Sequence, residues 1–375
     1  MESEKVAVSP KIPILDLSYE MKELKPQIMS AIEEVLDLGA FIMGPNVKKF
    51  EQEVAEYLGV KYAVTLNSGT DALVIALLAA GIGEGDEVVT TAFTFFATAE
   101  AISRVGAVPV FVDIDPSTYN MNIDLLESAI TEKTRAVIPV HLFGQSLDMD
   151  PLLEIAKRHQ LIIIEDVAQA FGGEYKGRMT GTIGDMGCYS FFPSKNLGAY
   201  GDGGLLVTNN HDFAEKAAML RAHGSKKKYY NELIGFNSRL DEIQAAILRV
   251  KFPHINDWNQ GRRMVAERYK EFLSDVKDIL LPIEEPYAKH VYHQYTVRVL
   301  NGKRDKLQAE LHEEGISTII YYPLPVHKLP VYESMKTSLP HCEALSYEVL
   351  SLPIWPQMEP ETQLNIAEKI KRVLG

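Results

Sequence analysis

The chain has 375 residues, of which 46 % are apolar and 24 % charged, a composition typical of a globular protein with about two domains. Its 38 basic and 51 acidic residues give a net charge of −13, so we expect no nucleic-acid partner. Two cysteines cannot form a disulfide framework or a cysteine-rich zinc site, and we expect no metal. No apolar run approaches the roughly 18 residues that span a bilayer, and the N-terminal sequence lacks a signal-peptide pattern. Both observations favour a cytoplasmic protein without a membrane partner.

Between about residues 61 and 209, short runs rich in Val and Ile alternate with longer amphipathic segments. The runs are too short for buried helices and predict strands, whereas the segments between them predict helices. This alternation indicates βαβ units and a mostly parallel sheet flanked by helices, which is an α/β fold. The predicted strands cover residues 62–66, 86–91, 108–114, 135–144 and 161–166, and the predicted helices cover residues 70–80, 97–105, 123–130 and 149–159.

The pattern changes in the last third of the chain. Residues 212–273 predict helices with an interruption at 224–237. Strands are then predicted at 292–300 and 318–322, and helices at 305–314 and 361–374. We therefore expect a large α/β domain with an N-terminal arm over residues 1–254, and a smaller C-terminal α+β domain over residues 255–375.

Residues 67–72, with the sequence Asn-Ser-Gly-Thr-Asp-Ala, follow a predicted strand and open a predicted helix. Small residues such as Gly69 let the backbone approach an anion, and a helix N-terminus offers free N–H groups. Thr70 or Asp71 in this place also fits a plain helix cap. The pattern alone leaves both interpretations open.

Two further stretches stand where ligands bind in open α/β sheets, at the carboxyl ends of strands. Asp166 ends the predicted strand at 161–166. A carboxylate at this place can be a metal ligand, a ribose acceptor, the partner of a protonated ring nitrogen, or a loop cap. Lys195 lies between an aromatic stretch and two glycine-containing turns. A lone lysine is usually a solvated surface residue, but partial burial would lower its pKa and make it a nucleophilic amine.

An anion cradle, an acid for a ring nitrogen and a buried lysine are together what pyridoxal phosphate requires. The lysine holds the aldehyde, the carboxylate keeps the pyridine ring protonated, and the cradle anchors the phosphate. Pyridoxal 5'-phosphate is therefore the cofactor that the sequence predicts.

From about Ile14 onward, the chain resembles the DegT-type nucleotide-sugar aminotransferases, which are fold-type-I pyridoxal-phosphate enzymes. The ordered motifs that carry the resemblance are SGTDAL from Ser68, GDEVVTTAFTFFATAEA from Gly85, GAVPVFVDID from Gly106, EDVAQAFGG from Glu165, SFFPSKNLGAYGDGG from Ser190, NSRLDEIQAAIL from Asn237 and YYPLPVHKLP from Tyr321.

The resemblance implies a role for each matching residue. Lys195 resembles the Schiff-base lysine that also carries the proton, and Asp166 the partner of the pyridinium nitrogen. The other implied cofactor contacts are Gln169 on the ring's 3-oxygen, Phe95 on the ring face, Gly69, Thr70 and Ser190 on the phosphate, and Asn237 on the phosphate of the neighbouring subunit. The last contact implies a homodimer with shared active sites. A place in the core is the alternative for Phe95.

The family also implies the reaction. Some members carry histidine in place of the lysine and catalyse dehydration, so Lys195 favours transamination. We expect glutamate as the amino donor, leaving as 2-oxoglutarate, with glutamine as an alternative. The acceptor would be a nucleotide-linked keto-sugar, and the product an amino sugar for a surface polysaccharide such as lipopolysaccharide or a related glycoconjugate.

Within the family the chain resembles most the branch that acts on UDP-linked 3-keto-N-acetyl-hexuronates. Arg239 is the expected cation for the uronate carboxylate, with pairing to Asp241 or another local acid as the alternative. Tyr321 and Tyr322 stand where that branch has His-Tyr, and a tyrosine supplies no positive charge. A neutral dTDP- or UDP-linked keto-deoxysugar is therefore an alternative substrate. A non-catalytic, sensor-like relative is the alternative from another class.

Weaker signals have plainer interpretations. The lysine run 226–228 is typical of a solvated loop, although it could meet a nucleotide diphosphate. His141 fits a hydrogen-bonded structural residue better than a metal ligand, and His327 lies in a proline-rich loop with a substrate or interface role open. Cys188 and Cys342 are predicted to be buried thiols.

Overall fold

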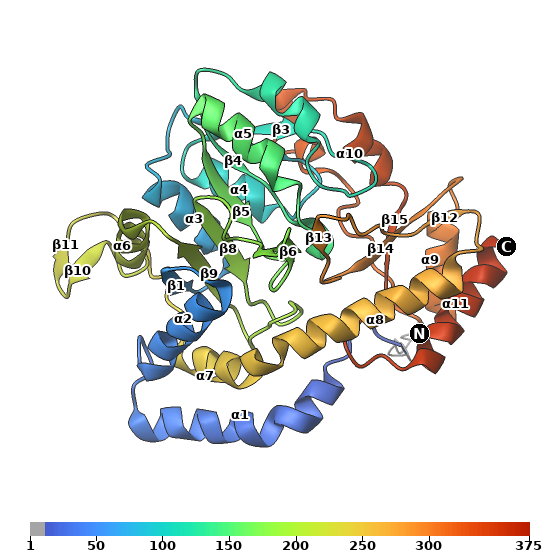
Figure 1. The fold of residues 1–375 in the computed structure, drawn as a ribbon, viewed down its shortest axis with the longest axis horizontal. Helices are drawn as coiled ribbons and strands as arrows, with labels where there is room; N and C mark the ends of the chain where they lie inside the picture. Colours follow the sequence, from blue (N-terminus) through green and yellow to red (C-terminus); the bar gives the residue numbers. More distant parts are fainter. Residues whose placement is uncertain (1–11) are drawn as a thin grey trace, which may run out of the picture.

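The computed structural model describes residues 12–375, and the N-terminal residues in which we searched for a signal peptide lie outside this range. Its centre is a seven-stranded sheet in the order β1-β9-β8-β5-β4-β2-β3 (Figure 1). Neighbouring strands run parallel except at β9, which is antiparallel to β1 and to β8. The strands are β1 (Tyr62–Leu66), β2 (Glu87–Thr91), β3 (Val108–Val112), β4 (Thr134–Ile138), β5 (Ile162–Asp166), β8 (Met186–Ser190) and β9 (Gly204–Thr208).

Helices cover both faces of this sheet, which confirms the α/β prediction. Alternate residues of β9 show the two faces, because Leu206 packs in one core cluster while Leu205 and Val207 pack in another. The first face carries α3 (Gly69–Ala79), α4 (Ala97–Arg104) and α6 (His211–Leu220). The second face carries α2 (Pro45–Leu58), α5 (Met149–His159) and α7 (Glu242–Lys251).

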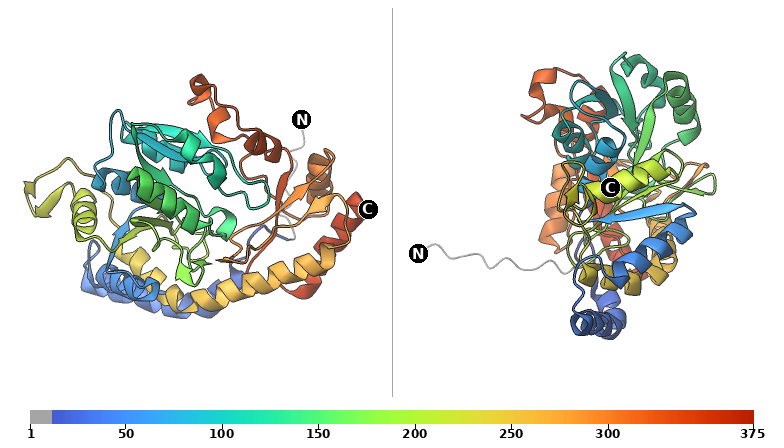
Figure 2. Two further views of the ribbon diagram at one scale, coloured as in Figure 1. Left: turned by 45° about the horizontal axis from the view of Figure 1, so that its top comes forward. Right: turned by 90° about the vertical axis from the view of Figure 1, so that its left-hand side faces the viewer.

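Most of the chain after residue 254, apart from the segment around α10, builds a second hydrophobic core. The helix α8 (Ile255–Leu273) runs from the large sheet toward this core and packs there with α9 (Arg304–Glu313) and α11 (Pro360–Leu374) (Figures 1 and 2). These helices cover a small antiparallel sheet of β12 (Ile279–Leu280), β14 (Tyr295–Val299) and β15 (Val349–Leu352). The division at residues 254 and 255 stays a proposal, which this separate core supports.

The remaining elements are short or peripheral. The helix α1 (Ser18–Leu38) lies along α7, and α10 (Pro340–Leu345) packs in a core cluster beside the large sheet. Single turns of helix are η1 (Ile123–Leu125), η2 (Glu127–Ala129), η3 (Leu142–Gly144), η4 (Phe252–His254), η5 (Val326–Lys328) and η6 (Glu333–Met335). The short strands are β6 (Glu174–Tyr175), β7 (Arg178–Met179), β10 (Ser225–Lys227), β11 (Tyr230–Asn231) and β13 (Ala288–Lys289).

Two element predictions were wrong for physical reasons. The predicted helix at 123–130 is two turns, η1 and η2, closed by three-residue bonds such as Leu126 N–H to the carbonyl of Ile123. The predicted strand at 318–322 makes a single bridge from Ile319 to Ser351. It ends at Tyr322, whose φ of 60° is the left-handed conformation that a strand excludes.

The lysine run 226–228 lies in the β10–β11 hairpin, which extends away from the body of the molecule (Figure 2). Lys226 pairs with Glu215, so part of the positive charge of the run is already compensated. The two cysteines are buried free thiols, as predicted. Within residues 12–375 no helix is long and apolar enough to cross a membrane.

Candidate active site

The first site segment joins the start of α3 to the end of β8. A Cβ atom added to Gly69 would lie 2.7 Å from Cβ of Ser190, so only glycine permits this approach. The hydroxyl of Ser68 accepts the N–H of Asp71 at 3.1 Å and is the N-cap of α3. The alternative that Thr70 or Asp71 caps this helix was therefore wrong, because Ser68 already occupies the capping position.

Asp166 ends β5 and is buried at the carboxyl edge of the sheet. Its Oδ2 accepts the hydroxyl of Thr98 at 2.9 Å, and its Oδ1 accepts the N–H of Ala168 at 3.1 Å. Burial raises the pKa of Asp166, while these two hydrogen bonds and the charge of Lys195 oppose part of that rise. A carboxylate in this state gains from a further cationic N–H donor.

Gln169 is held between two other segments. Its Oε1 accepts the N–H of Phe143 at 2.8 Å, and its Nε2 donates to the hydroxyl of Tyr322 at 2.8 Å. Both partners have positive φ, 56° for Phe143 and 60° for Tyr322, and their rings stack with centroids 6.1 Å apart. Non-glycine residues in this conformation store strain, which is often found beside ligands. One N–H of the Gln169 amide remains for a further acceptor.

Lys195 follows β8 in a tight turn, in which its N–H donates to the carbonyl of Phe192 at 2.8 Å. Burial lowers the pKa of its side chain to about 8, and the charge of Asp166 opposes part of this shift. Within residues 12–375 its amine forms no hydrogen bond that raises the pKa. The lysine is therefore a partly neutral amine near physiological pH rather than a solvated cation.

A buried ion pair fixes the turn that follows Lys195. Nζ of Lys251 donates to the carbonyl of Gly198 and pairs with Glu20 at 2.7 Å. The hydroxyl of Tyr200 donates to the same carboxylate at 2.8 Å. The helix α1 is thereby tied to the segment that carries Lys195.

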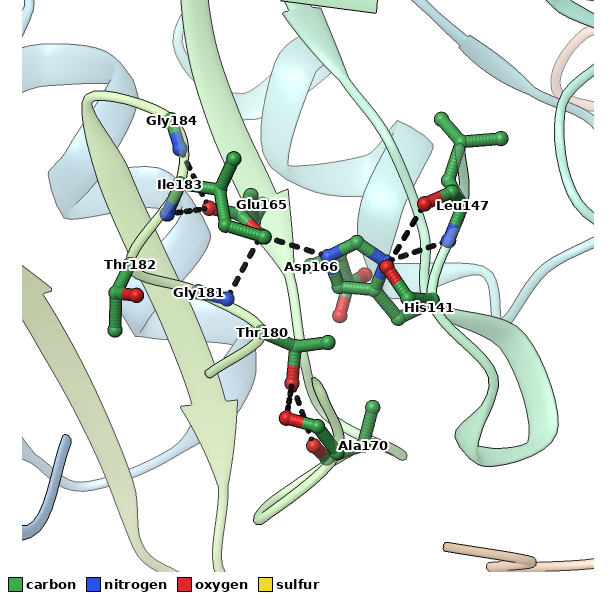
Figure 3. Close-up of polar contacts among 12 residues, drawn as sticks. His141, Leu147, Glu165, Asp166, Ala170, Thr180, Gly181, Thr182, Ile183 and Gly184 are labelled. Atoms are coloured by element: carbon green, nitrogen blue, oxygen red, sulfur yellow. Dashed lines mark hydrogen bonds and ion pairs between the residues drawn. The ribbon is translucent and has the colours of Figure 1, made fainter. Parts of the chain in front are cut away.

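A second buried network lies next to Asp166 (Figure 3). Glu165 accepts Nε2–H of His141 at 2.8 Å and the three backbone N–H groups of Gly181, Ile183 and Gly184 at 2.7 Å each. Nδ1 of His141 accepts the N–H of Leu147 at 3.1 Å, which assigns the neutral imidazole with its proton on Nε2. His141 is thus the hydrogen-bonded structural residue that we predicted.

The remaining predicted residues lie in other segments. Phe95 precedes α4 with 62 % of its surface exposed, so it is not a core residue. Asn237 is exposed and accepts a hydrogen bond from Nη2 of Arg239 at 2.5 Å. Nε of Arg239 is buried without a hydrogen-bond partner among the described residues, and the expected alternative pair with Asp241 does not form.

The segment 237–239 also touches the start of α3. The hydroxyl of Ser238 donates to Oδ1 of Asn67 at 2.8 Å. No hydrogen bond among the described residues links Asn237 or Arg239 to Asp166 or Gln169. Assignment of Asn237 to the phosphate of a neighbouring subunit therefore stays a proposal.

Tyr321 and His327 have different surroundings. Tyr321 is partly exposed beside Tyr322. His327 is buried and its Nε2 lies 3.1 Å from Oε1 of Glu343, on the side of α10. These contacts place His327 in the packing of α10.

Thr98 was missed in the sequence. It is four residues after Thr94, and the two hydroxyl groups lie 3.0 Å apart. A pair of threonines one helical turn apart, directly after a strand, was the available signal, but it is also common in helices that bind nothing. Only folding brings the hydroxyl of Thr98 to the carboxylate of Asp166.

The residues present fit pyridoxal phosphate. The close approach of Gly69 and Ser190 leaves backbone N–H groups at the start of α3 for a phosphate. Asp166 is a buried acceptor that lacks a full complement of donors, and Lys195 is an amine with lowered pKa. Within the described part of the chain, no cluster of three or more metal-ligating residues is found.

Comparison with known proteins identifies the class. Residues 22–371 match the DegT/DnrJ/EryC1/StrS aminotransferase family, and the chain belongs to this family. It is therefore an enzyme with pyridoxal phosphate as its cofactor, rather than the non-catalytic relative considered above.

Individual relatives cover nearly the whole chain. The chain is 52 % identical to a pleiotropic regulatory protein of Geobacillus stearothermophilus, over 96 % of this chain and 97 % of the relative. It is 46 % identical to a UDP-N-acetyl-3-dehydro-α-D-glucosamine 3-aminotransferase of Acidithiobacillus ferrooxidans, over 97 % and 98 %. It is 42 % identical to a UDP-2-acetamido-2-deoxy-3-oxo-D-glucuronate aminotransferase of Pseudomonas aeruginosa, over 93 % and 96 %.

A solved structure also matches nearly the whole chain. DesV of S. venezuelae, solved in complex with a ketimine intermediate, superposes with a TM-score of 0.94 at 43 % identity. The match covers 97 % of this chain and 98 % of DesV. The predicted fold class is thereby confirmed.

Proposed function

We propose that this enzyme transfers an amino group from glutamate to a UDP-linked 3-keto-N-acetyl-hexuronate. The relatives named above that act on UDP-linked 3-oxo sugars support the nucleotide and the position of the keto group. A neutral dTDP- or UDP-linked keto-sugar is the alternative acceptor. The amino sugar formed would serve the synthesis of a surface polysaccharide or a related glycoconjugate.

The cofactor would be held by the residues at the carboxyl edge of the sheet. Gly69, Thr70 and Ser190 would bind its phosphate together with the partner subunit's Asn237. Asp166 would pair with the ring nitrogen, Gln169 would donate to the ring oxygen, and Phe95 would cover one face of the ring. The protonated ring of pyridoxal phosphate draws electrons from the reacting carbon, which makes the carbon-bound proton acidic.

Lys195 would hold the cofactor and then move this proton. An amine whose pKa burial lowers to about 8 releases and accepts a proton near neutral pH, as general acid–base catalysis requires. Asp166 must stay ionised to keep the ring nitrogen protonated. Its hydrogen bonds from Thr98 and Ala168 favour that ionised form.

Arg239 carries the argument for a uronate. Its Nε is buried without a partner among residues 12–375, and its Nη2 donates to an uncharged amide rather than to an acid. A guanidinium that lacks an acid partner remains free to bind a carboxylate in a bidentate manner. Tyr321, which would line the same substrate, contributes a hydrogen bond but no charge.

Absorbance spectra test the reaction and Arg239 tests the substrate. Glutamate should remove the visible band of the yellow holoenzyme, and a nucleotide keto-sugar should restore it. Arg239→Gln should lower kcat/KM for the UDP-3-keto-hexuronate by about ten- to a hundredfold, because a charge-assisted contact is lost. The neutral UDP-3-keto-N-acetylglucosamine is the matched substrate, and its kcat/KM should stay within about twofold. Equal losses on both sugars would contradict the uronate assignment.

A further inference from the structure

A recess of about 40 Å³ adjoins the turn that carries Lys195. Its apolar wall comes from residues 14 and 15 of the N-terminal segment and from β15 with the residues just after it. Its polar lining comes from four separate segments and consists of Ser194, Arg262, His293, Gln294 and Tyr321. Ser194 is the residue directly before Lys195, and the charge of Lys195 acts on His293 in the same lining.

Arg262, on α8, is a buried cation without an acidic partner. It is 3 % exposed, and its Nη1 donates to the carbonyls of Tyr292 and His293 at 3.2 Å each and to that of Ile354 at 3.4 Å. Its Nε has no hydrogen-bond partner in the described part of the chain, where no ion pair to Arg262 forms either. The carbonyls fix the orientation of the guanidinium. The charge of Glu20, which already pairs with Lys251, acts on Arg262 without direct contact and leaves room for a closer anion. A buried charge in this state is unfavourable until an anion joins it.

Arg262 is the only cation among the described residues that line the recess, because the other polar groups are uncharged. Burial, and then the charges of Lys195 and Arg262, lower the pKa of His293 well below its ordinary value, so this imidazole is neutral. Gln294 is 7 % exposed, and its Oε1 is an acceptor without a donor among the described residues. The recess thus offers one cation and one free acceptor next to the turn that carries Lys195.

We propose that this recess binds a carboxylate of the amino donor, with Arg262 as the group that recognises it. The inference rests on the proposed function, since it names the place where glutamate is held during its half of the reaction. The free Oε1 of Gln294 would accept an N–H of the same ligand. Donor and keto-sugar occupy the active site in turn. The carboxylate of a uronate has the same chemistry as that of glutamate, so the experiment must distinguish these two ligands of Arg262.

The two half-reactions separate these sources. Holoenzyme is mixed rapidly with glutamate, and the aminated enzyme is mixed separately with the UDP-3-keto-hexuronate, while the visible band is followed. Arg262→Gln should raise the KM for glutamate about ten- to a hundredfold, and Arg262→Lys less, since it keeps the charge without the planar fork. The sugar half-reaction should change by less than about twofold.

The neighbouring arginine provides the matched control. Arg263 lies on the same helix but pairs with Glu284 and donates to the carbonyl of His290, outside the lining of the recess. Arg263→Gln should therefore leave both half-reactions unchanged. Loss in the sugar half-reaction alone would assign the recess to the uronate and overturn the proposal. Equal losses in both halves would make Arg262 a structural residue, which also overturns it.

Donor analogues and a binding probe complete the test. Glutamate, glutamine and the α-amide of glutamate differ only in which carboxylate carries a charge. The amide that lacks the carboxylate bound by Arg262 should react slowly with the native enzyme. Its rate should not fall further in Arg262→Gln, and this behaviour identifies which carboxylate Arg262 binds. Glutarate should raise the melting temperature of the native holoenzyme and not of Arg262→Gln. If Arg262→Gln does not fold, Arg262→Lys with glutarate decides, and full retention of the glutarate shift and of the glutamate KM overturns the proposal.

The failure of this inference is distinct from that of the proposed function. An enzyme that transaminates keto-sugars with an unchanged glutamate KM in Arg262→Gln refutes only the recess. If the native enzyme shows no spectral response to glutamate, glutamate is not the donor. The assignment of the recess to the donor then fails too, whether or not glutarate raises the melting temperature.

Discussion

The hydroxyl of Thr98 donates to Oδ2 of Asp166 over 2.9 Å and so joins the first turn of α4 to the end of β5. Asp166 is buried, and burial raises its pKa. The N–H of Ala168 and the hydroxyl of Thr98 oppose this rise, because both stabilise the ionised carboxylate. The helix α4 thereby helps to keep charged the group that must face a protonated ring.

Removal of this hydroxyl should shift the acidic limb of the reaction. In Thr98→Val the pKa of Asp166 rises further, so less of the carboxylate is ionised at any pH near the limb. The acidic limb of kcat/KM should move to higher pH, and kcat at neutral pH should fall about two- to tenfold. Thr90→Val, which loses a hydroxyl bonded to the carbonyl of Ile138, is the control and should leave the limb in place.

The pKa of Lys195 should govern the uptake of the cofactor. Only the neutral amine attacks an aldehyde, and burial lowers the pKa of this amine to about 8 from an ordinary value of 10.5. The rate at which cofactor-free protein gains the visible band should rise with pH and level off above about pH 8. A rate that keeps rising toward pH 10.5 would show an ordinary, solvated lysine, and Lys195→Ala should gain no band at all.

Glu165 should matter for stability more than any surface acid. Its carboxylate accepts His141 and three backbone N–H groups in the core. Glu165→Gln should lower the free energy of unfolding by about 2–4 kcal/mol, because the amide NH2 group cannot accept a hydrogen bond and leaves buried N–H donors unsatisfied. Glu174→Gln breaks a partly exposed pair with Lys289 and should cost no more than about 1 kcal/mol in urea unfolding of the cofactor-free protein.

Mixed dimers would reveal a shared active site. Lys195→Ala and Asn237→Asp subunits should each be inactive alone. After subunit exchange, half of the dimers are mixed and each has one intact site if Asn237 acts across the interface. About a quarter of the native activity should then return. No recovery, with mixed dimers present by mass spectrometry, would confine Asn237 to its own subunit, where Ser238 already contacts Asn67.

The sequence predicted the sheet well where strands are buried and continuous. The runs at Tyr62 and Leu161 became β1 and β5, whose apolar side chains pack under helices on the two faces of the sheet. β8 and β9 were not predicted as strands. Their pairing depends on contacts between distant segments, such as Ser190 with Gly204, which no local pattern shows.

Some residues of the site could likewise be predicted from the sequence, and others could not. Asp166 and Lys195 stand in recognisable motifs and could be chosen from the chain alone. Thr98, Arg262 and the tie between Gln169 and Tyr322 arise from side chains that meet only after folding. Tyr322 shows the limit most clearly, because its apolar neighbours predict a strand while its φ of 60° turns the chain toward Gln169.

The contacts from Glu20 through Lys251 to Gly198 connect α1 to the turn that follows Lys195, so the position of this helix affects the active site. Anything that pulls α1 away would leave the Lys251 ammonium buried without its acid and loosen the turn behind Lys195. Truncation past Glu20 would therefore yield a protein that keeps its sheet and binds its cofactor poorly. The segment that carries Glu20 should accordingly be left intact in purification.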